Sequence, residues 1–202
     1  MPSIIDPETT PPRRAIFGGS FDPVHLGHLG MVTASQGALE LDEVIFVPCH
    51  VSPFKSGTVA TGAQRMELLE LAIRDSGFSW ASVSPIEIDR EGSSYSWETA
   101  SFFAAEDSAS EWYWILGTDQ WDSIERWANP EILKELLHFV VLTRDGQPVS
   151  EREGWRYTAV PFSHPASSTV IRAGVEEKRG WVTPGVLEYC LENKLYQEAE
   201  EI

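Results

Sequence analysis

Two histidines and two glycines stand close together near the amino terminus, in the segment from Gly18 to His28. Glycines let backbone amides approach a phosphate closely, and the free N–H groups at the start of a helix favour negative charge. His25 and His28 are three residues apart, so on the opening turn of a helix they share one face. We therefore predict a polyphosphate-binding loop that uses imidazoles in place of a lysine, with Gly27 leaving room for the ligand. The residues expected to contact phosphate in this loop are Gly18, Gly19, Ser20, Phe21, His25 and His28.

A second group of phosphate-binding character lies near the carboxyl terminus. Ser167, Ser168 and Thr169 precede an apolar stretch that suits a helix, and serine is a good N-cap residue. Hydroxyls and free amides at a helix start bind phosphate, and Arg172, one turn further on, can donate two hydrogen bonds to phosphate oxygens. Taken alone, this segment fits a plain capped helix equally well.

Alternating apolar strands and helical segments must position these residues. We expect strands over 15–17, 44–47, 80–88, 113–116, 139–142 and 157–160, and helices over 26–39, 64–73, 96–105, 120–127, 130–137, 168–178 and 183–193. This alternation predicts an α/β protein with a Rossmann-like, doubly wound parallel sheet, helices on both faces and a small C-terminal helical extension. We expect a loose leader over 1–12, one domain over 13–197 with its C-terminal helical part over 165–197, and an acidic tail over 198–202.

Composition limits the classes of partner. The 202-residue chain carries 15 Lys and Arg against 31 Asp and Glu, a formal net charge of −16, which argues against nucleic acid or an anionic membrane as a partner. Cys49 and Cys190 are too few for a disulfide framework or a zinc site. The amino terminus lacks the features of a signal peptide, and no apolar run approaches the ~20 residues of a membrane span. We expect a cytoplasmic protein, and a homo-oligomer is left open.

The motifs resemble those of one enzyme family. The segment Gly18–His28 resembles the G-x-F-x-P-x-H-x-G-H signature of nucleotidyltransferases with a Rossmann-like fold. Ala166–Arg172 resembles the I-S-S-T-x-I-R motif, with Ala166 where Ile is usual. Within the superfamily, the chain resembles the nicotinate/nicotinamide mononucleotide adenylyltransferases from about Arg13 to Tyr196.

The resemblance implies nucleotide contacts for further residues. Gly117 and Asp119 match a G-x-D motif that contacts the nucleotide, and a carboxylate can accept a hydrogen bond from a ribose hydroxyl. Trp127 matches the tryptophan on which the pyridine ring stacks, although core packing is a serious alternative in a chain with eight tryptophans. Leu195 and Tyr196 match the closing part of the family's fold, and we expect them to serve packing.

The mononucleotide side is implied by two other segments. Ser94, Tyr95 and Ser96 match the S-Y-T motif of the mononucleotide site, with Ser96 in place of Thr. Lys55 would meet the mononucleotide phosphate, whereas Phe54 stands where the family usually has His. Arg65 matches a Q-R motif of structural or electrostatic role. We expect Lys55, Arg65 and Arg172 to form a cationic entrance on an acidic body.

The implied reaction is attack of a mononucleotide 5′-phosphate on the α-phosphorus of ATP, with release of pyrophosphate. The nucleophile is already an anion, so catalysis would rest on alignment and charge stabilisation by His25, His28 and Arg172, with His28 contacting the transition state. Mg²⁺ would arrive with ATP and be held by phosphate oxygens and water, without metal ligands from the protein. The acceptor would be nicotinate or nicotinamide mononucleotide.

Other functions remain open at this stage. A related nucleotidyltransferase would use another phosphorylated acceptor, as pantetheine-phosphate adenylyltransferases do, or CTP as donor, as cytidylyltransferases do. A non-catalytic module would bind a dinucleotide without turnover. A class I aminoacyl-tRNA synthetase shares the His-x-Gly-His pattern, but the length and the acidic charge leave no room for tRNA recognition.

Overall fold

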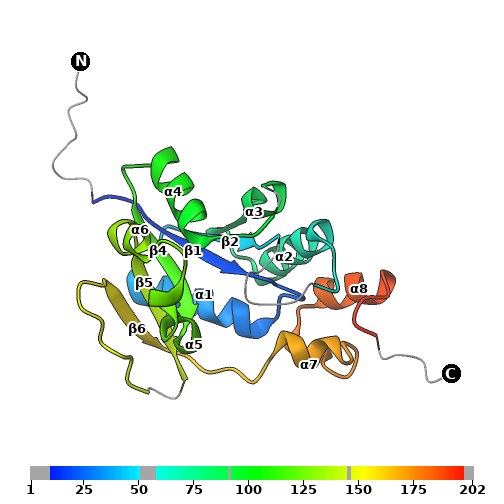
Figure 1. Ribbon diagram of the computed structural model, residues 1–202. Helices are drawn as coiled ribbons and strands as arrows, with labels where there is room; N and C mark the ends of the chain where they lie inside the picture. Colours follow the sequence, from blue (N-terminus) through cyan, green and yellow to red (C-terminus); the bar gives the residue numbers. More distant parts are fainter. Residues whose placement is uncertain (1–9, 51–57, 91, 145–146, 198–202) are drawn as a thin grey trace.

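Six parallel strands form a single sheet in the computed structural model, which describes residues 10–50, 58–90, 92–144 and 147–197 (Figure 1). The strands are β1 (Arg13–Gly19), β2 (Glu43–Pro48), β3 (Ala81–Val83), β4 (Glu111–Gly117), β5 (His138–Thr143) and β6 (Tyr157–Pro161). Their order across the sheet is β3-β2-β1-β4-β5-β6. The predicted parallel sheet is thus confirmed. Lys55, Phe54 and the tail over 198–202 lie outside the described residues.

Helices cover both faces of this sheet. They are α1 (Leu26–Leu39), α2 (Gly62–Ser76), α3 (Ile86–Asp89), α4 (Ser96–Glu106), α5 (Thr118–Trp121), α6 (Pro130–Leu136), α7 (Ser168–Arg172) and α8 (Pro184–Glu192), with 3₁₀ turns at Ile124–Arg126 and Arg179–Trp181. One buried cluster joins one face of the sheet to α1, α2 and α8, and a second joins the other face to α4, α5 and α6 (Figure 1). This is the doubly wound arrangement that the sequence predicts.

The middle of the central strand β1 is an apolar run, Ala15–Phe17, because it is buried on both faces of the sheet. Ala15 and Phe17 belong to the cluster under α1 and α2, while Ile16 between them belongs to the cluster under α4 and α6. All three are 4% exposed or less. A strand buried on both faces has no polar side to alternate with, so it reads as a continuous apolar run.

The order of the strands creates a switch point beside β1. The chain leaves β1 toward β2 on one side and later returns to place β4 on the other, where Ile16 lies opposite Trp114. In open α/β sheets, ligands bind outside the carboxyl ends of the strands at such a point. The loop that follows Gly19 and the helix α5 that follows Gly117 both start at this edge.

Three predicted elements are wrong in extent. The helix expected over 120–127 is interrupted, because the Ser123 N–H closes a turn on the Gln120 carbonyl after α5 ends at Trp121, and a 3₁₀ turn follows at Ile124–Arg126. The strand expected over 80–88 ends at Val83, and Pro85 opens the short helix α3 instead. Proline has no N–H for a sheet ladder, so it breaks a strand pattern that otherwise alternates. The helix expected over 168–178 ends at Arg172, because Gly174 follows and its N–H closes a turn on Ile171.

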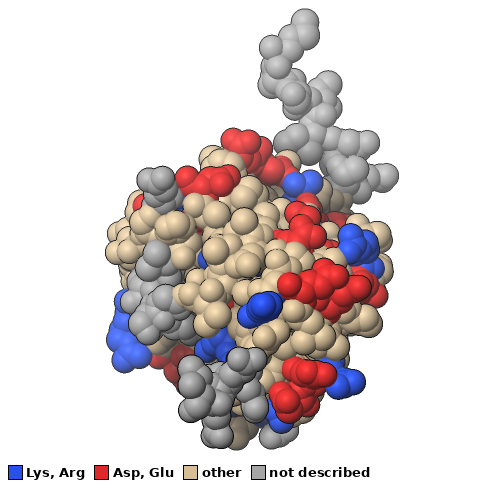
Figure 2. Space-filling model, turned by 90° about the vertical axis from the view of Figure 1, so that its right-hand side faces the viewer, with Lys and Arg blue, Asp and Glu red and all other residues tan. Residues whose placement is uncertain are grey.

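Surface charge is unevenly spread. On the face drawn in Figure 2, acidic side chains gather toward the upper and right-hand edges, while the middle is mostly uncharged and carries isolated basic side chains. The acidic side chains behind the net charge of −16 are therefore unevenly distributed over this face. Within the described ranges, no helix has both the length and the apolar character needed to span a membrane.

Candidate active site

His25 and His28 cap the first helix reciprocally. His25 is the N-cap of α1; its Nδ1 accepts from the His28 N–H at 3.4 Å, and the His28 Nδ1 accepts from the His25 N–H at 3.3 Å. The two imidazoles stack with their centroids 3.7 Å apart. In a neutral ring whose Nδ1 is an acceptor, the hydrogen sits on Nε2. Both rings therefore share a face, as predicted, and each carries its donor on the nitrogen away from the cap.

His25 is held as a neutral imidazole. Its residue is 7% exposed, and burial lowers the pKa of His25 from 6.5 to about 4, with the nearby His164 adding to the decrease. At neutral pH this side chain acts as a hydrogen-bonding group and not as a cation. His164 was not predicted from the sequence as a neighbour of His25. The available signal was its position three residues before Ser167, in a segment predicted to bind phosphate.

The glycines of the motif make room for side chains. A Cβ on Gly18 would lie 2.9 Å from the Trp114 ring, and a Cβ on Gly27 would lie 2.9 Å from the His25 ring. Both spacings are too short for any other residue to fit without movement. The space beside Gly27, which we expected a ligand to use, is taken by His25.

Arg172 and Ser168 bind the backbone of the first motif. The Arg172 guanidinium donates to the Asp22 carbonyl at 2.8 Å and to the Thr169 Oγ1 at 3.2 Å. The Ser168 hydroxyl donates to the Pro23 carbonyl at 3.0 Å. The structure thus brings the two predicted phosphate-binding segments into direct contact.

Ser167 has the N-cap position of α7, as predicted, although its side chain makes no capping hydrogen bond. Its neighbour Thr169 is exposed. The first amides of α7 therefore receive no hydrogen bond from the Ser167 side chain.

Arg65 supports the same loop from beneath. It is 1% exposed, and its guanidinium donates to the Ser20 carbonyl at 2.8 Å. Its Nε is buried without a hydrogen-bond partner. The expectation that Arg65 lines a cationic entrance is wrong, because α2 buries this side chain under the loop; Lys55, the other predicted cation, lies outside the described residues.

Gly117 and Asp119 sit at the end of β4, next to β1. Gly117 is the N-cap of the short helix α5, and Asp119 lies in its first turn with an exposed side chain. The carboxylate therefore lies at the switch-point edge, where an acceptor for a ribose hydroxyl was predicted.

Trp127 lies between core and surface. Its ring is partly buried, meets Trp114 edge-on at 6.4 Å between centroids, and its Nε1 donates to the Ser123 hydroxyl at 3.4 Å. The same Trp114 ring packs under Gly18. Trp127 is thus connected to the phosphate loop through one indole.

Ser94, Tyr95 and Ser96 lie at the start of α4. Tyr95 is the N-cap and is 39% exposed, and Ser96 is the first helical residue. The buried Ser94 accepts from the His50 N–H at 2.9 Å, which ties this segment to the loop after β2. Of the predicted mononucleotide residues, Ser94 therefore lies at the carboxyl side of β2, whereas Trp127 packs on Trp114 of β4 and Lys55 lies outside the described residues.

A buried carboxylate anchors that segment. Glu87 accepts from the Thr99 hydroxyl at 2.7 Å and is also hydrogen-bonded to Ser94. Burial raises the pKa of Glu87, while both hydroxyls act in the opposite direction. Sequence reasoning missed this residue because it fell inside the strand predicted over 80–88.

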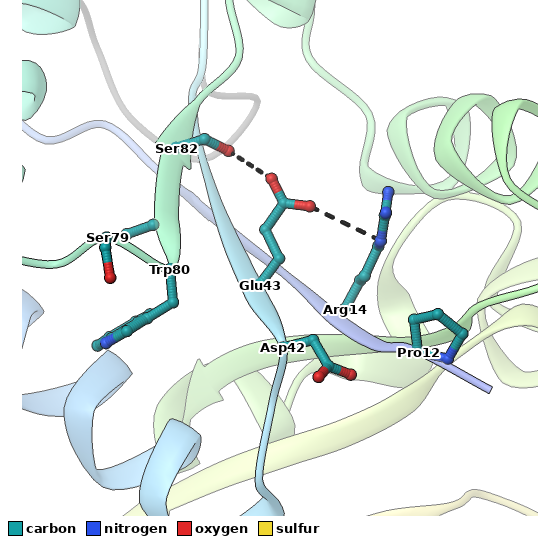
Figure 3. A pocket seen from close by; sticks show the side chains of 8 residues that line it. Pro12, Arg14, Asp42, Glu43, Ser79, Trp80 and Ser82 are labelled. Atoms are coloured by element: carbon teal, nitrogen blue, oxygen red, sulfur yellow. Dashed lines mark hydrogen bonds and ion pairs between the residues drawn. The ribbon is translucent and has the colours of Figure 1, made fainter. Parts of the chain in front are cut away.

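Two cavities lie away from the predicted residues. One of about 270 Å³ opens at the amino ends of β1, β2 and β3, where Glu43 joins Arg14 and Ser82 (Figure 3). A second, of about 830 Å³, runs between α3 and α4 beside Phe102. Neither is lined by a residue predicted for the site. Among the described residues, no group of three His, Cys, Asp or Glu side chains is arranged to hold a metal ion.

Comparison with known proteins identifies the family. A family model for cytidylyltransferase-like proteins matches residues 16–174. A probable nicotinate-nucleotide adenylyltransferase of Methylacidiphilum infernorum is 34% identical over 94% of this chain and 94% of its own length. The chain belongs to the nicotinate-nucleotide adenylyltransferase family.

Further relatives agree with this assignment. A probable nicotinate-nucleotide adenylyltransferase of Aliarcobacter butzleri is 34% identical over 81% of this chain and 88% of its own length. The nicotinic acid mononucleotide adenylyltransferase of Plasmodium falciparum, solved in complex with NaAD, superposes with a TM-score of 0.76 at 20% identity, covering 94% of this chain and 100% of its own. At that identity the structural likeness speaks for the Rossmann-like fold.

Proposed function

We propose that this protein transfers the adenylyl group of ATP to nicotinate mononucleotide, forming deamido-NAD and pyrophosphate in NAD biosynthesis. The observation that carries the proposal is the meeting of the His25–His28 cap with Arg172 at the switch point, through the Asp22 carbonyl. Nicotinate is favoured as the base because the relatives carry that name.

The chemistry is an in-line displacement at phosphorus. A phosphate oxygen of the mononucleotide forms a bond to the α-phosphorus, the bond from that phosphorus to the α–β bridging oxygen breaks, and its electron pair leaves with pyrophosphate. Because the nucleophile is an anion, no base is needed. ATP enters as its Mg²⁺ complex, in which phosphate oxygens and water hold most of the metal coordination.

The described residues would act as donors around the phosphates. His28 donates from Nε2 to the α-phosphate as charge develops, and His25, neutral at pH 7, orients the neighbouring phosphates. Arg172 offers its charge to the departing pyrophosphate. Asp119 accepts from the ribose of ATP, and Trp127 supports the pyridine ring.

An acceptor screen tests this proposal. Purified protein is supplied with ATP and either nicotinate mononucleotide, nicotinamide mononucleotide or pantetheine phosphate, and separately with CTP as donor, while pyrophosphate release is followed. We expect the highest kcat/KM with ATP and nicotinate mononucleotide. We also expect His28→Ala to lower kcat by roughly 100- to 1000-fold, as for loss of one transition-state donor, in a protein that remains folded although it loses one hydrogen bond of the α1 cap.

The alternatives have their own outcomes. Preference for nicotinamide mononucleotide would change the base while keeping the reaction. Turnover only with pantetheine phosphate or only with CTP would reject the proposal in favour of a related transferase. Binding of deamido-NAD without any pyrophosphate release would indicate a binding module.

A further inference from the structure

A buried carboxylate occupies the middle of the phosphate loop. Asp22 is 4% exposed, and its two oxygens accept from the Val59 N–H at 2.9 Å, the Ala60 N–H at 3.0 Å and the Tyr196 hydroxyl at 2.6 Å. The first two donors stand just before α2, whereas Tyr196 stands 174 residues further along the chain. One side chain of the loop is therefore held by two distant parts of the chain.

Tyr196 does more than pack. Its ring is 4% exposed within the cluster under α1, α2 and α8, so the packing that we expected is present. Its hydroxyl also reaches Asp22, and its carbonyl accepts from the Val175 N–H at 3.0 Å, three residues after Arg172. Burial and the hydrogen bond to Asp22 raise the pKa of Tyr196, so the hydroxyl keeps its proton and donates it.

The backbone of the same aspartate holds Arg172. The Asp22 carbonyl accepts from the Arg172 guanidinium at 2.8 Å, while the carboxylate accepts from Tyr196. A shift of Asp22 would therefore move the partner that orients the guanidinium. The neighbouring Pro23 carbonyl, bound by Ser168, would move with it.

We propose that Tyr196 is a positioning residue for ATP, acting through Asp22 to fix the phosphate loop and the Arg172 guanidinium. The inference rests on the proposed function, in which Arg172 meets the pyrophosphate part of ATP. Among the described residues, the hydrogen bonds of Tyr196 join it to Asp22 and Val175, and none joins it to the segment at the start of α4. Loss of the hydroxyl should therefore weaken ATP binding selectively.

Tyr196→Phe is the deciding variant, because it removes one oxygen and keeps the buried ring. A hydrogen bond to a charged acceptor is lost, and we expect the KM for ATP to rise about tenfold while the KM for the mononucleotide stays within about twofold. Calorimetric binding of a non-hydrolysable ATP analogue, without acceptor, should weaken by a similar factor.

Tyr113→Phe is the matched control. Tyr113 is 6% exposed, and its hydroxyl donates to the Glu111 carboxylate at 3.0 Å. Residues Glu111 and Tyr113 lie toward the amino end of β4, away from the switch-point edge. This variant loses the same kind of hydrogen bond and should leave both KM values and analogue binding unchanged.

Three results would overturn the inference. The first is a Tyr196→Phe variant that has a lower melting temperature but binds ATP as the wild type does. The second is an equal rise of both KM values in this variant, and the third is behaviour identical to that of Tyr113→Phe in every measurement. Asp22→Asn, which cannot accept all three hydrogen bonds, should raise the KM for ATP more than Tyr196→Phe does. If the wild type proves inactive, the proposed function fails, while analogue binding by these variants still decides whether Tyr196 positions the loop.

Discussion

His25 makes the stability of the protein depend on pH in a calculable way. Burial lowers its pKa from 6.5 to about 4, so the folded protein prefers the neutral ring. A lowered histidine pKa stabilises the fold fully above the unfolded value, and this contribution is lost as the pH falls toward the folded value. Converted at 1.36 kcal/mol per pH unit, the full effect is about 3 kcal/mol, of which about 2 kcal/mol should be lost by pH 5.

His25→Asn isolates this effect from the rest of the protein. Asparagine is a strong N-cap residue, so the variant keeps a cap for α1 while removing the titrating ring. Urea unfolding of both proteins at several pH values between about 7.5 and 5 gives the difference in unfolding free energy, in which the titration of shared groups cancels. We expect the wild type to lose about 2 kcal/mol relative to the variant over that range.

A flat difference over the same range would refute the reasoning. It would mean that the folded protein binds the proton as readily as the unfolded chain, and that burial does not hold the ring neutral. The titration of the ring itself gives an independent measurement: the His25 carbon-bound ring protons should titrate in nuclear magnetic resonance spectra with a midpoint of about 4. His138→Asn, at the start of β5, is the control, because burial also lowers the pKa of His138. The unfolding free energy of the wild type relative to this variant should also fall as the pH falls, whereas nucleotide binding by the variant should be unchanged.

Two further predictions concern the mononucleotide side. Trp127→Ala should raise the KM for the mononucleotide by about 2- to 30-fold, the range expected for loss of an aromatic partner, while the KM for ATP changes little; equal changes would assign Trp127 to the core. Glu87→Gln should gain stability relative to the wild type as the pH rises from 4.5 to about 7.5, because the raised pKa of the buried Glu87 makes the ionised form costly to the fold. Urea unfolding at the two pH values measures it, and a gain in the opposite direction would show that the hydrogen bonds from Thr99 and Ser94 outweigh burial.

The sequence predicts most of the fold because the central strands β1, β2, β4 and β5 each contain a short run of buried apolar residues. Helix α1 has the predicted bounds, since His25 supplies the cap and the αL residue Glu40 ends the helix. The errors in extent occur at Pro85, Ser123 and Gly174, where the backbone turns although the apolar spacing of the sequence continues. Hydrophobic spacing reports which side of an element is buried, and it carries little information on where the backbone turns.

The sequence could predict which residues belong to the candidate site, but it could not predict which hydrogen bonds those residues make. That Ser168 and Arg172 bind the carbonyls of Pro23 and Asp22 depends on contacts across about 150 residues, which spacing along the chain cannot encode. The partners of Glu87, Asp22 and Tyr196 were missed for the same reason. A buried polar group is recognised by what surrounds it, and this is known only once the chain is folded.

The hydrogen bond between Asp22 and Tyr196 also bears on the order of folding. Contacts between residues 174 apart in sequence close late, because the chain loses much entropy in joining its distant parts. During synthesis, the segment from Gly18 to His28 leaves the ribosome long before Tyr196 does, so a nascent chain holds His25 and His28 without the hydrogen bond between Tyr196 and Asp22. We expect the sheet to form early around β1 and β2, and the hydrogen bonds that join Asp22 to Tyr196 and to Arg172 to form among the last.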